Sequence, residues 1–344
     1  MKLIIQIPCY NEEKTLPLTF EDLPRKLDGI EIIEYLVIND GSTDKTVQVA
    51  RELGIHHIVS FSNNRGLAMG FKAGIDACLR LGADIIVNTD GDNQYSGKSI
   101  VDLIQPILNG QAEIVVGNRQ TDSIEHFSPL KKQLQKMGSW VVRKASNSNV
   151  IDSTSGFRAY TRDAAMQMNI VSDYTYTLET IIDAGRKKMA ISNIPIETNE
   201  KLRESRLMKS IWSYINRSAS TIVRIYTMYR PLKVFLSIGL LFVLSGFAIG
   251  LRYLYFYLTG DGSGHVQSLI LASILLTTGF QLGIFGLLAD AIAANRKVND
   301  EMLYRLKRLE YDKVDRIENG DLFDQHICYL RETACTKFGT NNKN

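Results

Sequence analysis

Oxygen-bearing side chains are concentrated in the stretch TDGDNQ, which follows the apolar run IIVN. Asp90, Asp92, Asn93 and Gln94 lie within five consecutive positions of this stretch. Once the strand ends, the pleat no longer fixes the directions of the side chains, so two carboxylates two residues apart can turn toward the same point. Asp90 and Asp92 can therefore share one hard divalent cation that also binds phosphate oxygens. The stretch predicts a site for Mg²⁺ or Mn²⁺ together with a phosphorylated ligand.

Two other kinds of binding loop are excluded by the residues at single positions. An EF-hand calcium loop that began at Asp90 would need glycine at its sixth position and glutamate at its twelfth. The chain has Tyr95 and Val101 there. A dinucleotide-binding domain would carry G-x-G-x-x-G after its first strand, where this chain reads PCYNEE. The chain therefore has no glycine-rich turn at which the pyrophosphate of a ligand could bind, and another group must neutralise the charge of that pyrophosphate.

Short β-rich runs alternate with helical patterns over the first part of the chain. The runs are LIIQI, EYLVIND, HHIVSF, ADIIVNTD and EIVVGN, and segments such as KTVQVARELG and GLAMGFKAGIDACLRLG separate them. This alternation predicts an α/β fold with a mainly parallel sheet covered by helices. Ligands of such sheets bind beyond the carboxyl ends of the strands. The polar clusters PCYNEE, NDGSTD, TDGDNQ and GNR follow the first, second, fourth and fifth runs, so they predict one pocket.

These motifs, together with NRGLAMGFKAG and SGFRAY, give the region from Lys2 to Glu204 a close resemblance to the family 2 glycosyltransferases. It is most similar to the polyprenyl-phosphate glycosyltransferase branch, which includes dolichyl-phosphate mannose synthases. The resemblance implies a GT-A nucleotide-sugar-binding fold, with helices on both faces of the sheet. It also implies inverting transfer of one sugar from a UDP- or GDP-linked donor to undecaprenyl or dolichyl phosphate.

The same resemblance assigns expected roles to individual residues. The donor nucleotide would contact Pro8, Tyr10, Glu12, Asp40 and Asp90. The metal ion, Mg²⁺ or Mn²⁺, would be held by Asp90, Asp92 and Gln94, with Asp92 acting in catalysis through the cation. Structural alternatives stay open for two of these acids. Asp40 or Asp44 could cap the following helix, and Glu12 could complement a helix dipole.

The acceptor phosphate is expected to meet cations on the same edge. Arg119 ends the fifth run, and Arg158 lies in SGFRAY. Arginine binds phosphate through two charge-assisted hydrogen bonds. The family often has a basic residue followed three positions later by serine. Lys132 matches the basic residue but Gln135 stands at the serine position. Asp152 stands where many family members carry a catalytic base, although an ionised phosphate needs little deprotonation and Asp152 could instead position or repel the acceptor.

Two long apolar segments follow. Val234–Leu251, continued by an aromatic cluster, and Val266–Ala289 each approach the ~20 residues that a membrane helix needs. Two buried core helices are the alternative. The stretch TGDGSGH between them lacks Lys and Arg, whereas both flanks are basic. The positive-inside rule then predicts a transmembrane hairpin with both termini cytosolic. The N-terminal apolar run is too short and polar for a signal peptide. The protein is therefore expected in the cytoplasmic or endoplasmic reticulum membrane, with its catalytic domain in the cytosol.

The predicted organisation has four parts. Residues 1–204 form the cytosolic catalytic domain, 205–231 form amphipathic helices at the membrane interface, 232–293 form the hairpin with spans of about 232–258 and 266–289, and 294–344 form a cytosolic helix and tail. Packing of 205–231 on the catalytic domain is the alternative for that segment. Val298, Met302, Leu306 and Leu309 recur at helical spacing, which is compatible with a homo-oligomer.

Two other function classes remain as rivals. A processive polysaccharide synthase of the same superfamily would normally show Q-x-x-R-W after the acceptor region, but the only tryptophans, Trp140 and Trp212, do not fit that motif. A non-catalytic membrane assembly partner would be expected to lose acids from its D-x-D, and both are present. Four cysteines without close spacing predict neither a zinc ribbon nor a disulfide framework, and no nucleic-acid partner is expected.

Overall fold

The structure is a computed structural model of the chain, and it describes residues 1–119, 142–143, 146, 148–170, 176–199, 220, 223–224, 226–227, 230–260 and 266–314. Lys132, most of the predicted interface segment 205–231 and the tail 315–344 lie outside these residues. The chain divides into two compact units. The first comprises Met1–Lys132, Ser148–Glu204 and Leu306–Asn344, and the second comprises Gln133–Asn147 and Ser205–Arg305.

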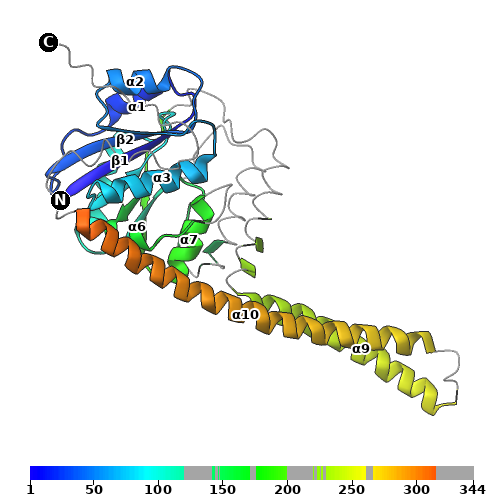
Figure 1. Cartoon of the computed structure of the whole chain (residues 1–344). Coiled ribbons are helices and arrows are strands. Elements are labelled where there is room, and N and C mark those ends of the chain that lie inside the picture. The colour runs from blue at the N-terminus through cyan, green and yellow to red at the C-terminus, as the bar shows by residue number, and fades with distance from the viewer. Residues whose placement is uncertain are drawn as a thin grey trace, which may run out of the picture. The chain divides into compact units, whose positions relative to one another are not determined.

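A seven-stranded sheet forms the centre of the first unit (Figure 1). Its strands are β1 (Lys2–Cys9), β2 (Ile32–Asn39), β3 (His57–Ser60), β4 (Ile85–Asn88), β5 (Ile114–Asn118), β6 (Arg158–Thr161) and β7 (Ile191–Pro195). They lie in the order β3-β2-β1-β4-β6-β5-β7. β6 is antiparallel to both of its neighbours, and the other pairs are parallel. The predicted mainly parallel sheet is confirmed.

The first five strands are the five runs that the sequence predicts, because each is an apolar segment bounded by polar residues. β6 and β7 escape that reasoning. β6 begins with a charged residue and has only four residues. The residues of β7 are partly buried to exposed, and the strand ends at a proline. Their place in the sheet depends on pairing with β4 and β5 rather than on a local pattern.

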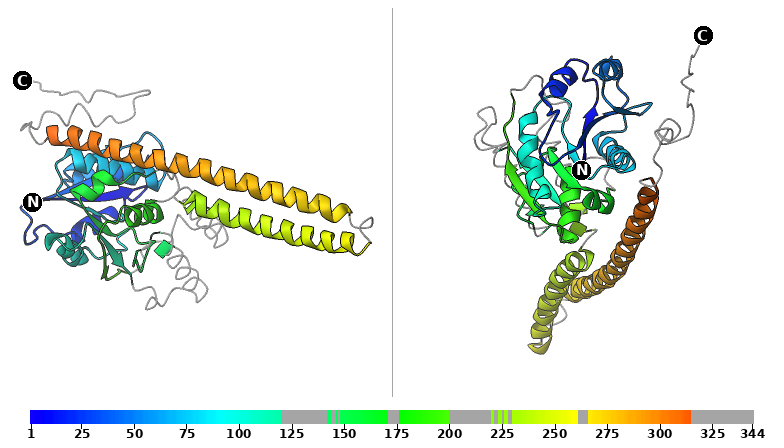
Figure 2. Two further views of the ribbon diagram at one scale, coloured as in Figure 1. Left: turned by 90° about the horizontal axis from the view of Figure 1, so that it is seen from below. Right: turned by 90° about the vertical axis from the view of Figure 1, so that its left-hand side faces the viewer.

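Helices cover both faces of the sheet, as predicted. They are α1 (Leu16–Asp22), α2 (Thr46–Glu52), α3 (Leu67–Arg80), α4 (Ile100–Leu108), α6 (Arg162–Gln167) and α7 (Tyr176–Arg186), with the short 3-10 helix η1 (Gly97–Ser99). Leu3, Ile5 and Ile7 of β1 share one core with α1, α2 and α4. The opposite face meets α3, where Phe71 stacks on Tyr176 of α7 at 3.8 Å between ring centroids. Figure 2 shows the two helical layers from other directions.

The second unit contains a helical hairpin. It is formed by α9 (Pro231–Leu258) and α10, a continuous helix from Val266 to Val314 that enters the first unit at Leu306. The two helices are antiparallel and approach closely at glycines. A Cβ on Gly239 would lie 2.9 Å from the carbonyl oxygen of Gly279, and one on Gly246 would lie 3.0 Å from that of Ala272. Small residues of this kind are typical of membrane helix pairs.

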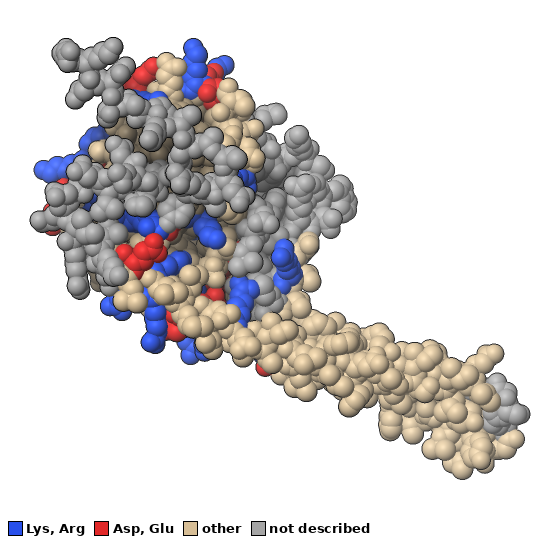
Figure 3. Space-filling view, viewed as in Figure 1, with Lys and Arg blue, Asp and Glu red and all other residues tan. Residues whose placement is uncertain are grey.

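Both helices are long and apolar enough to cross a membrane. Only 11% and 17% of the residues in their most apolar windows are buried, which disfavours the alternative of core helices. The outer part of the hairpin shows no charged side chains on its visible face (Figure 3). The cytosolic helix expected from residue 294 is the continuation of α10, so the second apolar run and the polar turns beyond it belong to one helix.

Candidate active site

The loops after β1 and β2 are joined by side chains from both motifs. The backbone amide of Thr43 donates to Asn11 Oδ1 at 2.8 Å, and the amide of Asn11 donates to Ser42 Oγ at 2.9 Å. The amide of Glu12 donates to Thr46 Oγ1 at 2.8 Å. Asn11 adopts a φ of 56°, a left-handed conformation that asparagine tolerates better than most residues. These bonds fix PCYNEE against NDGSTD at the carboxyl edge of the sheet.

Asp40 organises the start of α3. Its two carboxylate oxygens accept hydrogen bonds from the amides of Arg65, at 2.7 Å, and Gly66, at 2.9 Å. Gly41 has a φ of +68°, and a Cβ there would lie 2.3 Å from the backbone of Asn63. Burial raises the pKa of Asp40 even though both amides favour its ionised form. It is Asp44, not Asp40, that contacts the start of α2, because Asp44 Oδ1 accepts from the amide of Thr46, the first residue of that helix, at 3.0 Å. A nucleotide contact of Asp40 stays a prediction.

Acidic groups converge where β1 and β4 end. Burial raises the pKa of the Cys9 thiol, and the negative charges of Glu12, Asp90, Asp44 and Asp92 raise it further. Gly91 lets the two loops touch, because a Cβ there would lie 2.9 Å from Cys9 Sγ and 3.3 Å from the Pro8 carbonyl. Tyr10 is partly exposed beside them. The structure therefore brings the D-x-D acids and the predicted nucleotide residues of β1 to one place.

The loop that carries Asp92 is tied to the segment after β7. The amide of Asn199 donates to the Gln94 carbonyl at 3.0 Å, and its side chain donates to Asn93 Oδ1 at 3.4 Å. Tyr95 and Thr198 form an isolated antiparallel bridge. Asn93 has a φ of 56°, so the loop needs a residue that accepts this conformation. Sequence reasoning missed this support, because no local signal links residues about a hundred positions apart.

The donor set at this edge fits a hard divalent cation. Within the described part of the chain, no three His, Cys, Asp or Glu side chains are grouped closely enough to hold an ion by themselves. Mg²⁺ typically takes only one or two protein carboxylates and completes its shell with substrate phosphates and water. Asp90 and Asp92 supply such carboxylates, and their charges reach the same buried thiol. The arrangement suits a cation that binds together with a phosphorylated ligand.

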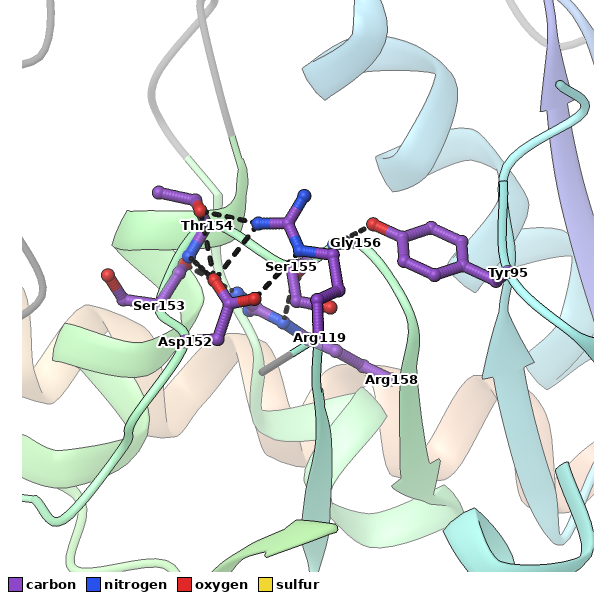
Figure 4. A network of polar contacts seen from close by, with 8 residues as sticks. All are labelled: Tyr95, Arg119, Asp152, Ser153, Thr154, Ser155, Gly156 and Arg158. Carbon is purple, nitrogen blue, oxygen red and sulfur yellow. Dashed lines mark hydrogen bonds and ion pairs between the residues drawn. The ribbon is translucent and has the colours of Figure 1, made fainter. Parts of the chain in front are cut away.

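Arg119 and Asp152 form a buried ion pair at the end of β5 (Figure 4). Arg119 Nε donates to Asp152 Oδ2 at 2.7 Å, and Nη2 donates to Oδ1 at 3.0 Å. Nη2 also donates to Thr154 Oγ1 at 2.7 Å, and the Thr154 hydroxyl donates to Asp152 Oδ1 at 3.0 Å. Asp152 is only 3% exposed. Arg119, predicted to bind the acceptor phosphate, thus pairs with Asp152, which stands at the position of the predicted catalytic base.

The electrostatic attraction between Arg119 and Asp152 shifts the pKa values of both residues. Burial would raise the pKa of Asp152, but the Arg119 charge and hydrogen bonds outweigh it and hold that pKa below its ordinary value. Burial alone would lower the pKa of Arg119, but the electrostatic effects of Tyr95, Asp152 and Asp90 and the hydrogen bond to Asp152 outweigh it and raise that pKa. Burial also raises the pKa of Tyr95 to about 12. Asp152 is therefore ionised and a weak base, and Arg119 lies within electrostatic reach of the D-x-D acid Asp90.

Arg158 does not take the place expected of a phosphate ligand. It is fully buried, and its guanidinium donates to the Ser155 carbonyl at 2.8 Å, the Ser153 carbonyl at 2.9 Å and Thr180 Oγ1 at 2.7 Å. A contact with the acceptor phosphate is not supported, because these donors already serve the protein interior. Arg158 instead shapes the segment 152–156 that holds the partners of Arg119.

Gly156 lies where several site residues meet, which sequence reasoning did not foresee. Its amide donates to Tyr95 Oη at 3.2 Å, and its carbonyl accepts from Asn88 Nδ2 at 2.8 Å. A Cβ at this position would lie 2.9 Å from Tyr176 Oη and 3.3 Å from Asp90 Oδ1. Glycine is thus needed for the close approach of SGFRAY to the D-x-D acid. The glycine in the SGF part of the motif is the sequence signal that could have indicated this close approach.

Residues 4–168 match the family described as glycosyl transferase family 2. The chain is 30% identical over 246 residues to a dolichyl-phosphate beta-glucosyltransferase of Trichomonas vaginalis, covering 65% of this chain and 72% of that protein. It is 29% identical over 216 residues to UDP-N-acetylglucosamine--dolichyl-phosphate N-acetylglucosaminyltransferase of Methanococcus voltae, covering 56% and 83%.

The crystal structure of glucosyl-3-phosphoglycerate synthase from Mycobacterium tuberculosis with UDP superposes with a TM-score of 0.54 at 18% identity, covering 65% of this chain and 80% of that chain. This likeness supports the GT-A fold that the sheet order and the two helical layers indicate. With the family match and the relatives, it leads to one conclusion. The chain belongs to glycosyl transferase family 2.

Proposed function

We propose that the protein is a membrane-bound inverting glycosyltransferase that moves one sugar from a nucleoside diphosphate sugar to a polyprenyl phosphate. The observation that carries this proposal is the position of Arg119, which lies within electrostatic reach of Asp90 and is held by Asp152. One site would thus combine acids for a donor diphosphate with a cation for a second anion. The two apolar helices and the named substrates of the relatives point to a lipid as the carrier of that anion.

The donor half is built from the loops after β1, β2 and β4. Tyr10 would offer its exposed ring to the base, and the buried acids Asp40 and Glu12 would offer carboxylates to the nucleotide. Asp90, Asp92 and Gln94 would hold Mg²⁺ or Mn²⁺. The metal, when bound, would neutralise the charge that grows on the diphosphate as it leaves. In the M. tuberculosis synthase, a complex contains Mn²⁺ together with UDP.

The acceptor half needs a cation more than a base. A phosphate monoester is already ionised at neutral pH, so one of its oxygens can attack the anomeric carbon directly. The new bond joins that oxygen to the sugar, and the bond from the sugar to the diphosphate breaks, so the electron pair leaves with the nucleoside diphosphate. Arg119 would orient the attacking phosphate, and Asp152 would hold Arg119 in place. An outcome with inverted configuration follows from a single displacement.

The cellular arrangement is part of the proposal. Both termini and the catalytic unit would lie in the cytosol, where nucleotide sugars are made, and the hairpin would cross the cytoplasmic or endoplasmic reticulum membrane. A polyprenyl chain could then stay in the bilayer while its phosphate enters the site. Residues 205–231 would lie at the membrane interface and Lys132 would contact the acceptor phosphate, and a homo-oligomer would be compatible with this arrangement.

Membranes that contain the protein provide the test. They would be incubated with Mg²⁺ or Mn²⁺, a panel of radiolabelled UDP and GDP sugars, and a polyprenyl phosphate. We expect one donor to yield a labelled lipid that mild acid hydrolyses, as a sugar phosphodiester should. The matched polyprenyl alcohol should give no product, because Arg119 would face no anion. Label that enters a polymer, or equal use of the alcohol, would contradict the proposal.

A further inference from the structure

The last described turns of α10 dock on the catalytic unit (Figures 1 and 2). Tyr311 is 1% exposed, whereas most neighbouring residues of α10 are exposed. Its hydroxyl donates to the Asp76 carboxylate on α3, and the Arg80 guanidinium lies 5.5 Å from the centre of its ring. A buried phenol that donates to a carboxylate and lies beside a guanidinium indicates a specific contact.

Two further side chains of these turns find separate partners. Glu310 forms an ion pair with Arg80 at 2.6 Å. Lys307 Nζ donates to the carbonyl of Met166, at 3.3 Å, and to that of Met168, at 3.1 Å. These are carbonyls at the C-terminal end of α6, where a lysine is a favourable cap. Residues 307, 310 and 311 thus fasten α10 to both α3 and α6.

The two helices α10 and α3 lead from this contact to different functional parts, which are the second apolar run and the predicted nucleotide edge. α10 is unbroken from Val266 to Val314, so the docked turns and the second apolar run are parts of one helix. About 27 Å of helix separates Lys307 from Ala289, the end of that run, at ~1.5 Å per residue. α3 begins at Leu67, directly after the amides that bind Asp40 on the nucleotide edge.

We propose that Lys307, Glu310 and Tyr311 are positioning residues that attach the catalytic unit to the membrane helix so that a bilayer-held acceptor phosphate reaches Arg119. This inference rests on the proposed function and goes beyond it. An acceptor with a long polyprenyl chain cannot leave the membrane, so the reach of its phosphate is limited. Attachment through these residues, in addition to the chain connection, raises the effective concentration of the active site where the acceptor phosphate can reach it. A short, water-dispersed acceptor diffuses to the site without this help.

Charge reversal across the Arg80–Glu310 pair tests the idea in the full-length protein reconstituted in vesicles. Arg80→Glu and Glu310→Arg should each lower transfer to a long-chain polyprenyl phosphate about fivefold, the change that loss of an ion pair worth about 1 kcal/mol produces. Transfer to a short-chain polyprenyl phosphate should stay close to that of the parent. The double variant R80E/E310R should regain part of the long-chain transfer, because it restores the pair with position 310 but not the ion pair of Arg80 with Asp76 at 3.2 Å. Hydrogen exchange of residues 72–80 would show whether each single variant has undocked.

A matched control removes a positive charge two residues away. Arg305 pairs with Glu301 on α10 itself, and both are exposed. Lys307→Gln should reduce long-chain transfer, whereas Arg305→Gln should not. Equal losses with long and short acceptors would show that the contact serves the donor site or the fold, and would overturn the proposal, as would single reversals that undock α10 without any loss. A parent that transfers to neither acceptor would instead refute the proposed function.

Discussion

At the scale of single residues, the metal site depends most on Asp92. Replacing it with asparagine keeps the size of the side chain but removes the charge that a divalent cation needs. We expect Asp92→Asn to lose Mn²⁺-dependent binding of nucleoside diphosphate and to lower turnover about a hundredfold or more. Calorimetric titration of nucleoside diphosphate with and without Mn²⁺ would measure the first effect.

Asn93 provides the control for that variant, because it lies in the same loop. Its φ of 56° suits glycine, whereas alanine at this position would be strained. Asn93→Gly should keep Mn²⁺-dependent binding close to that of the parent, apart from the weak bond to Asn199. Unchanged Mn²⁺ and nucleotide binding by Asp92→Asn would remove the metal assignment.

Asp152 and Arg119 make a second prediction, which distinguishes a positioning acid from a general base. Asp152→Asn should raise the KM for polyprenyl phosphate about tenfold, the effect of weakening a charge-assisted hydrogen bond, while kcat and donor hydrolysis change little. Steady-state kinetics with varied acceptor would separate the two constants. A fall in kcat of a thousandfold at unchanged acceptor KM would identify Asp152 as a base, since general bases contribute about that much.

The same pair predicts how stability depends on pH. Burial raises the pKa of Asp152, but Arg119 more than compensates, so the folded-state value lies below the unfolded one. The ionised carboxylate therefore stabilises the fold above its unfolded pKa of about 4, and this contribution is lost as pH falls through the folded-state pKa. The free energies of unfolding of the parent and Asp152→Asn should differ most near neutral pH and converge in acid. Denaturant unfolding in detergent at several pH values would test this, and a difference that does not vary with pH would contradict it.

At the scale of elements, α3 offers two glycines four residues apart with opposite expectations. A Cβ on Gly70 would make an ordinary contact of 3.7 Å with Ile38, whereas a Cβ on Gly74 would lie 2.3 Å from Gln6 Oε1 and 2.9 Å from Ile38 Cδ1. Gly70→Ala should stabilise by about 0.4–1 kcal/mol through helix propensity and the unfolded state. Gly74→Ala should destabilise by about 1–3 kcal/mol through overpacking.

The cost at Gly74 should also reach the site, because Gln6 Nε2 donates to Asn88 Oδ1 at 2.9 Å and Asn88 holds the Gly156 carbonyl. Thermal unfolding of both variants in detergent would give the stability order, and donor KM would report the effect on the site. Equal melting temperatures for the two alanine variants would show that the close contact at Gly74 relaxes freely.

At the scale of the whole molecule, the hairpin predicts which residues face each side of the membrane. In a C328S/C335S background, the remaining Cys9 and Cys78 are buried. A cysteine at Thr259, at the end of α9, should react with an impermeant thiol reagent in intact cells. A cysteine at Leu309, which is exposed on α10, should react only after permeabilisation. Labelling of Leu309→Cys from outside would contradict a cytosolic catalytic unit.

Much of this architecture is present in local patterns. Apolar runs predict β1 to β5, a periodic pattern predicts α3, and uninterrupted hydropathy predicts α9 and the first half of α10, because each depends on residues close in the chain. The polar clusters at the strand ends predict the shared edge, since parallel strands present their carboxyl ends together. The sequence could not show β6, whose charged first residue is buried through hydrogen bonds to the carbonyls of Ser153 and Ser155 and to the Thr180 hydroxyl.

The sequence by itself determined the family, the positions of the first five strands along the chain and the chemistry available at their ends, because residue type and short-range spacing decide these. Only the tertiary structure decided which charges meet. Arg119 and Arg158 are alike in the sequence, yet one pairs with Asp152 at the edge of the site and the other is buried among carbonyls. Tyr311 finds Asp76 across 235 positions. The role of an ionisable group depends on its burial and on the partners within about 3 Å, and both arise only when distant segments pack together.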